Sequence, residues 1–194
     1  MRDETFTRCF GSGEALYENY HDHEWGVPVH DERELFERLC LEAFQCGLSW
    51  GLVLRRREGM SDALAGFDAE TLARFGPPDV ERLLHDDRML KNRLKIEAVI
   101  HNAQVLLDLH EGGDSLEQVM WSHRPVTHAR PASFADMPSQ TLESQALTAD
   151  LKRLGFKFVG PVTMYATMQA IGIVNDHLVG CPAGDVIEQK GAAS

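Results

Sequence analysis

Apolar residues recur every three or four positions through most of the chain, and runs of alternating apolar and polar residues are scarce. This spacing gathers side chains on one face of an α-helix and is not that of a strand, so we predict a mainly α fold. The longest amphipathic run covers residues 92–110 and ends at Gly112 and Gly113. Shorter helices are expected at residues 14–21, 32–43, 50–57, 61–65, 68–75, 79–85 and 115–121.

Residues 122–139 are expected to form an irregular loop, and a helix that starts at Thr141 or Ser144 follows it. That helix is predicted to stop at Gly155, and the segment 155–160 (GFKFVG) connects it to another helix that opens at Pro161. Its two end glycines, Gly155 and Gly160, let backbone amides approach another backbone closely, and amides at a helix start bind anions. Since Lys152, Arg153 and Lys157 flank the turn, the pattern is typical of a helix–hairpin–helix phosphate clamp.

The chain has 194 residues, enough for one domain or two small lobes with a buried core. Its formal net charge of −11 argues against a protein that coats nucleic acid, but it allows a small basic face on an acidic body. We expect the basic residues around 155–160 and at 55–57 to form a local stripe. Further candidate phosphate contacts are Arg88, Lys91, Arg93 and Lys95.

The sequence indicates a cytoplasmic protein that does not associate with a membrane. No apolar run reaches the length of a membrane span, and the N-terminal stretch MRDETFTRCF lacks the apolar segment of a secretory signal. Four cysteines are few for this length, and disulfides are not expected in a reducing compartment.

Four residues near the two ends of the chain could bind one metal ion. His177 and Cys181 are spaced to share one helical face, and Cys9 and His21 lie near the N-terminus. Two thiolates and two imidazoles suit tetrahedral zinc and would leave no open position for catalysis, so such a site would be structural. Spacing alone leaves open the alternative of buried cysteines and a hydrogen-bonded histidine, with His23 competing for the role of His21. The remaining cysteines, Cys40 and Cys46, are expected in the core.

A candidate binding pocket centres on Glu42, in the largely apolar stretch LEAFQCGLSW. A carboxylate there must be paired, close to the surface or functional, because burying it unpaired costs several kcal/mol. Aromatic residues nearby in the sequence would suit a flat ligand that is cationic or rich in N–H donors. They are Tyr17, Tyr20, Trp25 and Trp50. The alternative is that these aromatics are core residues and that Glu42 is a salt-bridged surface residue.

Five segments together resemble the 3-methyladenine DNA glycosylase I family. They are YHDHEWGVP, LFERLCLEAFQCGLSW, KNRLKIEAVIHNA, LKRLGFKFVG and VNDHLVGC, and they occur in the order of that family from Cys9 to Cys181. The resemblance implies a helix–hairpin–helix DNA glycosylase fold whose N- and C-terminal segments are joined by a structural zinc site. Residues 1–194 would form a single unit, which could divide into a helix–hairpin–helix lobe that includes 141–172 and a zinc-clipped lobe made by both termini.

The resemblance also implies a function in base excision repair. The enzyme would hydrolyse the N-glycosidic bond of 3-methyladenine in double-stranded DNA and leave an abasic site, as a monofunctional enzyme without lyase activity. It would act as a monomer that associates with the nucleoid, and a non-catalytic reader of alkylated DNA or a zinc hydrolase are the alternatives. No role in proton transfer is expected for Asp176, in contrast to the catalytic aspartate of many relatives in the superfamily.

Residue roles follow from the same resemblance, position by position. The zinc ligands would be Cys9, His21, His177 and Cys181, and the base pocket would contain Glu42, Tyr17, Tyr20 and Trp50. Glu42 would be the essential carboxylate and would act by binding. Leu48, in the turn after the pocket helix, would probe the duplex, and Gly155, Lys157 and Gly160 would contact the phosphate backbone. Departures from the family pattern occur at Ala43, Cys46 and Gly51.

Overall fold

The computed structural model describes residues 8–191, and helices, turns and loops are the only structures that it assigns there. The mainly α prediction is therefore confirmed for this part of the chain. The N-terminal stretch that is expected to lack a secretory signal begins with residues 1–7, which lie outside the described residues. None of the helices within 8–191 is long and apolar enough to cross a membrane. The α-helices are α1 (Ala15–His23), α2 (Glu32–Gln45), α3 (Trp50–Ala63), α4 (Ala69–Leu72), α5 (Pro77–His85), α6 (Arg93–Glu111), α7 (Leu116–Trp121), α8 (Leu142–Leu154), α9 (Pro161–Ala170) and α10 (Pro182–Gly191), with 3₁₀-helices η1 (Ala65–Phe67) and η2 (Phe134–Asp136).

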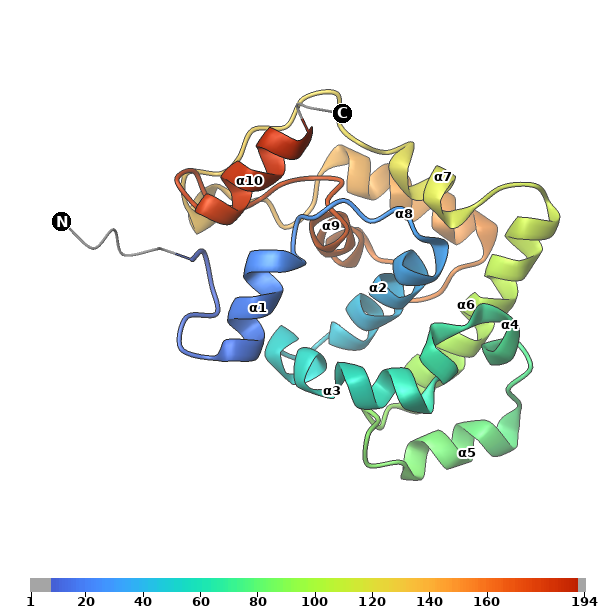
Figure 1. The fold of residues 1–194 in the computed structure, drawn as a ribbon. Helices are drawn as coiled ribbons and strands as arrows, with labels where there is room; N and C mark the ends of the chain where they lie inside the picture. Colours follow the sequence, from blue (N-terminus) through green and yellow to red (C-terminus); the bar gives the residue numbers. More distant parts are fainter. Residues whose placement is uncertain (1–7, 192–194) are drawn as a thin grey trace.

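Helix α2 lies at the centre of the molecule (Figure 1) and packs against α3, α6, α7 and α9. Asp31 fixes its start, because the Asp31 carboxylate accepts a hydrogen bond from the backbone N–H of Glu34 at 2.9 Å. Apolar side chains such as Phe36 and Phe44 are fully buried on it, and two charged residues, Arg38 and Glu42, are buried there as well. The central helix therefore carries both the hydrophobic core and two charged groups removed from water.

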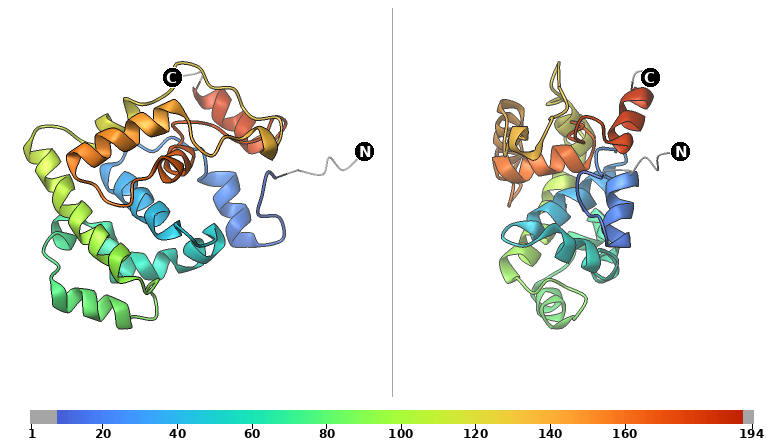
Figure 2. Two further views of the ribbon diagram at one scale, coloured as in Figure 1. Left: turned by 180° about the vertical axis from the view of Figure 1, so that it is seen from behind. Right: turned by 90° about the vertical axis from the view of Figure 1, so that its left-hand side faces the viewer.

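The first and last helices of the described chain, α1 and α10, pack against each other, and Figures 1 and 2 show both on the same side of the molecule. The expectation that His177 and Cys181 share a helical face is wrong. Both lie in the irregular segment that precedes α10, a helix that the sequence analysis did not predict. Gly180 has φ +84°, which interrupts any helix there, and Pro182 opens α10 at a position that suits proline.

The turn between α8 and α9 forms where the sequence predicts it. Gly155 ends α8 with φ +105°, and its N–H donates to the carbonyls of Leu151 and Lys152. The buried Asn102 of α6 holds the turn from behind. Its side chain donates to the carbonyl of Lys157 at 3.0 Å and accepts from the N–H of Lys157 at 2.8 Å. This reciprocal pair fixes the backbone of the turn while the Lys157 side chain stays exposed.

Helix α3 is longer than expected, since the segments 50–57 and 61–65 are largely one helix that runs through Gly59 to Ala63. A glycine inside a helix costs about 1 kcal/mol relative to alanine. Here close packing explains it, because a Cβ at Gly59 would lie only 3.0 Å from the Cβ of Arg88. Residues 122–140 form the expected loop and contain only the short η2 as regular structure.

Candidate functional site

A cavity of about 200 Å³ lies between α1, α2, α3 and α9 and is open to solvent on one side. Its walls include all four residues expected in a binding pocket, so the structure brings Tyr17, Tyr20, Glu42 and Trp50 together. The complete lining is Phe10, Tyr17, Tyr20, Trp25, Glu42, Gln45, Trp50, Phe134, Met137, Ala166 and Gln169.

Glu42 is the only acidic residue of this lining, and its side chain forms no hydrogen bond or ion pair with residues 8–191. The residue is 4% exposed, and its Oε2 atom is buried without a hydrogen-bond partner among the described residues. Burial raises the pKa of Glu42 to about 8, and the positive charge of Arg38 opposes that rise. The alternative of a salt-bridged surface glutamate is therefore wrong. A buried carboxylate without a partner is costly for the fold, and a ligand with N–H donors or a positive charge would satisfy it.

Aromatic rings surround this carboxylate. The ring centroids of Tyr20 and Trp50 lie 5.1 Å apart with the planes inclined at 48°, and Phe10 lies 4.8 Å from Trp25. The indole N–H of Trp50 is buried and also has no hydrogen-bond partner in the part of the chain that the structure describes. The cavity therefore offers flat apolar faces, one unused acceptor and one unused donor, a combination that fits a flat heterocycle with both donors and acceptors on its edge.

Several lining residues were not predicted from the sequence. Phe10 stands next to Cys9, and an aromatic beside a candidate metal ligand could have been noticed. Phe134 and Met137 belong to the loop before α8, where helical periodicity carries no information about position. The others not named from the sequence are Gln45, Ala166 and Gln169.

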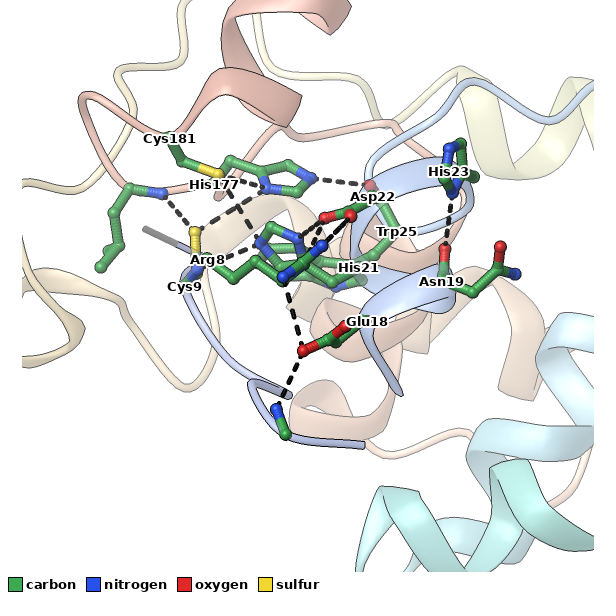
Figure 3. Close-up of polar contacts among 12 residues, drawn as sticks. Arg8, Cys9, Glu18, Asn19, His21, Asp22, His23, Trp25, His177 and Cys181 are labelled. Carbon is green, nitrogen blue, oxygen red and sulfur yellow. Dashed lines mark hydrogen bonds and ion pairs between the residues drawn. The ribbon is translucent and has the colours of Figure 1, made fainter. Parts of the chain in front are cut away.

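The four candidate metal ligands form one cluster beside the pocket (Figure 3), although they come from opposite ends of the chain. One ligand atom from each of Cys9, His21, His177 and Cys181 lies within 4.8 Å of the other three. Cys181 Sγ is 3.6 Å from His21 Nε2 and 3.4 Å from His177 Nδ1, and Cys9 Sγ is 3.8 Å from His177 Nδ1. His23 does not take part, because its ring contacts the carbonyl of Asn19 at the surface.

Groups outside the cluster orient three of its ligands. His21 Nδ1 lies 2.8 Å from an oxygen of Asp22, and His177 Nε2 lies 2.9 Å from the carbonyl oxygen of Trp25. These contacts turn the other ring nitrogens, His21 Nε2 and His177 Nδ1, toward the two cysteines, which is how metal-binding histidines are usually held, and His21 Nε2 also accepts from the N–H of Cys9 at 3.2 Å. The thiol of Cys9 accepts a hydrogen bond from the N–H of Leu178 at 3.2 Å. Donor type, number and orientation thus fit a tetrahedral zinc ion.

Several other expectations about single residues are corrected. Cys46 is exposed, with its Sγ 3.3 Å from Thr163 Oγ1, whereas Cys40 is buried as expected. Lys95 cannot contact phosphate, because it is buried and donates to the carbonyls of Phe44 and Cys46 at 2.8 and 2.5 Å.

Two charged groups outside the pocket are occupied by partners within the protein. The guanidinium of Arg57 binds the carboxylates of Glu24 and Glu37, so it does not belong to a free basic stripe. Asp176 is buried and accepts from Tyr165 and Gln169 at 2.7 and 2.6 Å. It does not line the cavity, so its contacts support the wall of the pocket around Gln169.

The model of the methyladenine glycosylase family matches residues 10–184 of this chain. The chain is 44% identical over 179 residues to DNA-3-methyladenine glycosylase 1 of Escherichia coli (strain K12), an alignment that covers 90% of this chain and 95% of the relative. A crystal structure of 3-methyladenine DNA glycosylase I superposes with a TM-score of 0.88 at 43% identity and covers 91% of this chain and 98% of that one. A variant of 3-methyladenine DNA glycosylase I in complex with 3-methyladenine superposes with a TM-score of 0.86 at 32% identity, covering 91% and 96% of the two chains.

Proposed function

Because the chain belongs to the methyladenine glycosylase family, we propose that it hydrolyses the N-glycosidic bond of 3-methyladenine in double-stranded DNA. The products are the free base and an abasic site. The cavity supports hydrolysis without a lyase step, since its described lining contains no lysine that could form a Schiff base with the sugar. The observation that carries the proposal is the unpaired carboxylate of Glu42 inside an aromatic cavity.

Methylation at N3 makes the purine cationic while it is still attached to the sugar, which weakens the glycosidic bond. The base leaves as a neutral molecule, so the enzyme need not protonate it. Its main tasks are to extrude the nucleotide, at a cost of a few kcal/mol, and to hold the cationic base in preference to neutral adenine. Aromatic faces attract a cation by about 2 kcal/mol when water is excluded, and an ionised Glu42 adds a direct charge interaction.

Glu42 acts in this proposal by binding. A positive base in the cavity favours the ionised form of the carboxylate, which then accepts hydrogen bonds from the adenine edge. The proton that Glu42 loses passes to solvent before the base is seated. Water attacks the sugar once the bond to the base has begun to break, forms the new C–O bond and releases one proton to solvent. The developing positive charge on the sugar is stabilised by the nearby carboxylate and the flanking phosphates.

Leu48 is well placed to enter the duplex beside the extruded nucleotide. It is 40% exposed in the turn that joins α2 to α3, the two helices that carry Glu42 and Trp50. Gly47 has φ +80° there, and the N–H of Leu48 donates to the carbonyl of Gln45 at 2.7 Å, which shapes the turn tightly. An apolar side chain held out at this position can fill the space that the base leaves.

The α8–α9 turn supplies a contact for the phosphate backbone. A Cβ placed on Gly160 would meet only Thr163 Oγ1 at 4.0 Å, so the space in front of this backbone is open. Gly160 is also the residue from which α9 starts, where free amides and the helix dipole favour an anion. With the exposed Lys157 beside it, the turn fits the helix–hairpin–helix clamp that the sequence indicates.

Zinc bound by Cys9, His21, His177 and Cys181 would have a structural role. The ion would supply a cross-link between the N-terminal segment and the segment before α10, and all four of its positions would be filled by protein. This cross-link would hold Phe10 and Tyr20, which neighbour two of the ligands, in the pocket wall.

The proposal is tested by the release of free base from methylated duplex DNA. The protein should release 3-methyladenine, and Glu42→Gln should reduce that release by about 10- to 100-fold, the value of a lost charge-assisted hydrogen bond of 1.5–3 kcal/mol. Glu58→Gln is a matched control, because Glu58 is exposed on α3 and does not line the cavity.

Two outcomes would contradict the proposal. Binding to methylated DNA without an abasic product would indicate a reader of alkylated DNA. Unchanged release by Glu42→Gln would remove the role assigned to that residue.

A further inference from the structure

A second buried charge lies behind the pocket carboxylate. Arg38 precedes Glu42 by one turn of α2 and is 3% exposed, but it is not part of the cavity lining. Fully buried arginines are rare unless their guanidinium is paired. The chain therefore keeps a positive charge inside the protein at a place where a ligand in the cavity cannot touch it.

The geometry of the helix directs the two side chains toward each other. Residues four apart on a helix have their Cβ atoms about 5–6 Å apart on the same face. Side chains lean toward the N-terminal end of their helix, so Glu42 leans back over the turn that holds Arg38. Both groups also keep unused polar atoms in the interior, namely Nε and Nη1 of Arg38 and Oε2 of Glu42.

The opposite end of the guanidinium is fixed by other carboxylates. Nη2 of Arg38 lies 2.8 Å from Glu24 and 3.0 Å from Glu34. Glu24 also binds Arg57, which in turn binds Glu37 at 2.7 Å. This chain of alternating charges holds Arg38 in place and leaves its Nε and Nη1 atoms without a partner among the described residues.

The remaining groups around Glu42 do not supply a comparable positive charge. Tyr17 and Tyr20 of α1 face it with phenols whose pKa values burial raises, and Tyr165 of α9 donates its hydroxyl to Asp176. Lys95 of α6 is committed to the carbonyls of Phe44 and Cys46. Among the described residues, Arg38 is the charged group that opposes the effect of burial on the pKa of Glu42.

We propose that Arg38 is a positioning residue for base selection: from behind the pocket wall its guanidinium orients Glu42 and favours the ionised form of the carboxylate, so that Glu42 gives up its proton more readily when a cationic base enters the cavity. This inference rests on the proposed function. It explains how a carboxylate that burial favours in its protonated form can still ionise when a cationic base binds near neutral pH. Because Arg38 stays outside the cavity, it adds no direct contact that would repel the cationic purine.

The test compares the pH dependence of base release in variants of Arg38. Arg38→Gln removes the charge but keeps a donor for Glu24 and Glu34, and it should move the acid limb of the profile upward by about one pH unit. Arg38→Lys keeps the charge and should restore most of the wild-type profile. Arg82→Gln removes an exposed arginine that binds Asp79 on α5 and should leave the profile unchanged. In a Glu42→Gln background, Arg38→Gln should cause no further shift of the limb.

A second measurement does not depend on catalysis. The ¹³C signal of the Glu42 carboxyl, assigned by its loss in Glu42→Gln, should titrate at a higher pH in Arg38→Gln than in the wild-type protein without DNA. If the wild-type protein released no base, the proposed function would fail, and this titration would still decide the role of Arg38. Arg38→Met repeats the comparison if the glutamine variant does not fold.

The proposal is overturned if removing the charge lowers thermal stability but moves neither the pH profile nor the Glu42 titration. Arg38 would then be only a structural partner of Glu24 and Glu34. A shift of equal size in Arg38→Lys would also overturn it, because the lysine variant keeps the positive charge.

Discussion

Tyr20 and His21 are neighbours on α1, but Tyr20 lines the cavity and His21 belongs to the metal cluster. In the cluster, both imidazoles have a second partner, Asp22 for His21 and the Trp25 carbonyl for His177. In the pocket, Glu42 Oε2 and the indole N–H of Trp50 are buried without any partner among the described residues. The histidines of the metal cluster are therefore hydrogen-bonded by the protein, whereas the buried polar groups of the adjacent pocket are not.

The difference indicates what each site is for. A cluster whose ligands are all oriented by the protein has little left to offer a substrate, and it stabilises the fold once an ion fills it. A pocket with unsatisfied buried groups destabilises the fold, and that cost is offset only when a ligand binds. Changes to the cluster should therefore act on stability, and changes to the pocket should act on binding.

The largest expected effect follows from removing a metal ligand. Cys181→Ala should lose bound zinc and a large part of the roughly 5–15 kcal/mol that stabilises a domain of this kind. Metal content by mass spectrometry and thermal unfolding with and without a chelator measure both effects. Cys46→Ala is the matched control, since Cys46 is exposed and lies outside the cluster. If a chelator stopped base release without lowering thermal stability, the metal would act in catalysis, and the cluster would not be a purely structural site.

A substitution in the pocket should raise the free energy of unfolding, whereas a substitution in the cluster lowers it. Burial raises the pKa of Glu42 to about 8, above the value of about 4.5 for the unfolded chain, so the folded protein binds more protons between these pH values. Stability must then fall as the pH rises through this window. Glu42→Gln removes that loss and should raise the free energy of unfolding by roughly 3 kcal/mol at pH 7, and by about 1 kcal/mol at pH 5.

Urea unfolding of both proteins at the two pH values measures the effect, with the exposed Glu58→Gln as control. If Glu42→Gln were less stable than the wild type at pH 7, the Glu42 carboxylate would have stabilising partners in the folded protein. The prediction would then fail even if activity is lost.

The predictions from the sequence were most accurate for features that depend on one helix alone, such as its boundaries. The run 92–110 became α6 (Arg93–Glu111) almost unchanged, because a long apolar stripe and a terminal Gly-Gly leave little freedom. The four cluster ligands also came together, although the reason given for two of them was wrong. His177 and Cys181 have helical spacing in the sequence, but Gly180 and Pro182 place them in a turn.

Arg38 shows what the sequence could not supply. It stands among glutamates in ERELFERLCLE, a pattern that normally indicates an exposed helical face. Its burial depends on Glu24, which approaches from the end of α1 only in the folded protein. Phe134 and Met137 were missed for a related reason, because no periodicity indicates which part of a 19-residue loop turns toward the pocket.

An intermediate effect is expected from the apolar residue at the edge of the pocket. Leu48→Ala should leave stability within about 0.5 kcal/mol of the wild type, since the side chain is 40% exposed. Base release from duplex DNA should fall roughly tenfold, as expected when a leucine no longer buries its side chain in the complex. Binding of free 3-methyladenine, followed by Trp50 fluorescence, should not change.

Leu94→Ala is the matched control for this variant, because Leu94 is 66% exposed on α6 and does not line the cavity. Equal losses in both variants would mean that the effect of Leu48 is not specific to its turn. A loss of free-base binding in Leu48→Ala would mean that the turn and the pocket form one site. Leu48 would then contribute to binding of the base and not only to binding of the duplex.

The smallest effect is expected at the turn between α8 and α9. Lys157 is exposed, and its backbone is fixed by Asn102, so Lys157→Ala removes a charge without disturbing the turn. Affinity for duplex DNA should fall a few-fold for methylated and unmethylated DNA alike, and the slope of log K against log salt should become shallower by about one. Arg82→Ala, on α5, should change neither quantity. Because a phosphate contact carries no information about the base, selectivity for 3-methyladenine should stay constant in Lys157→Ala. A change in that selectivity would mean that the phosphate contact, and not only the pocket, helps to distinguish the methylated base.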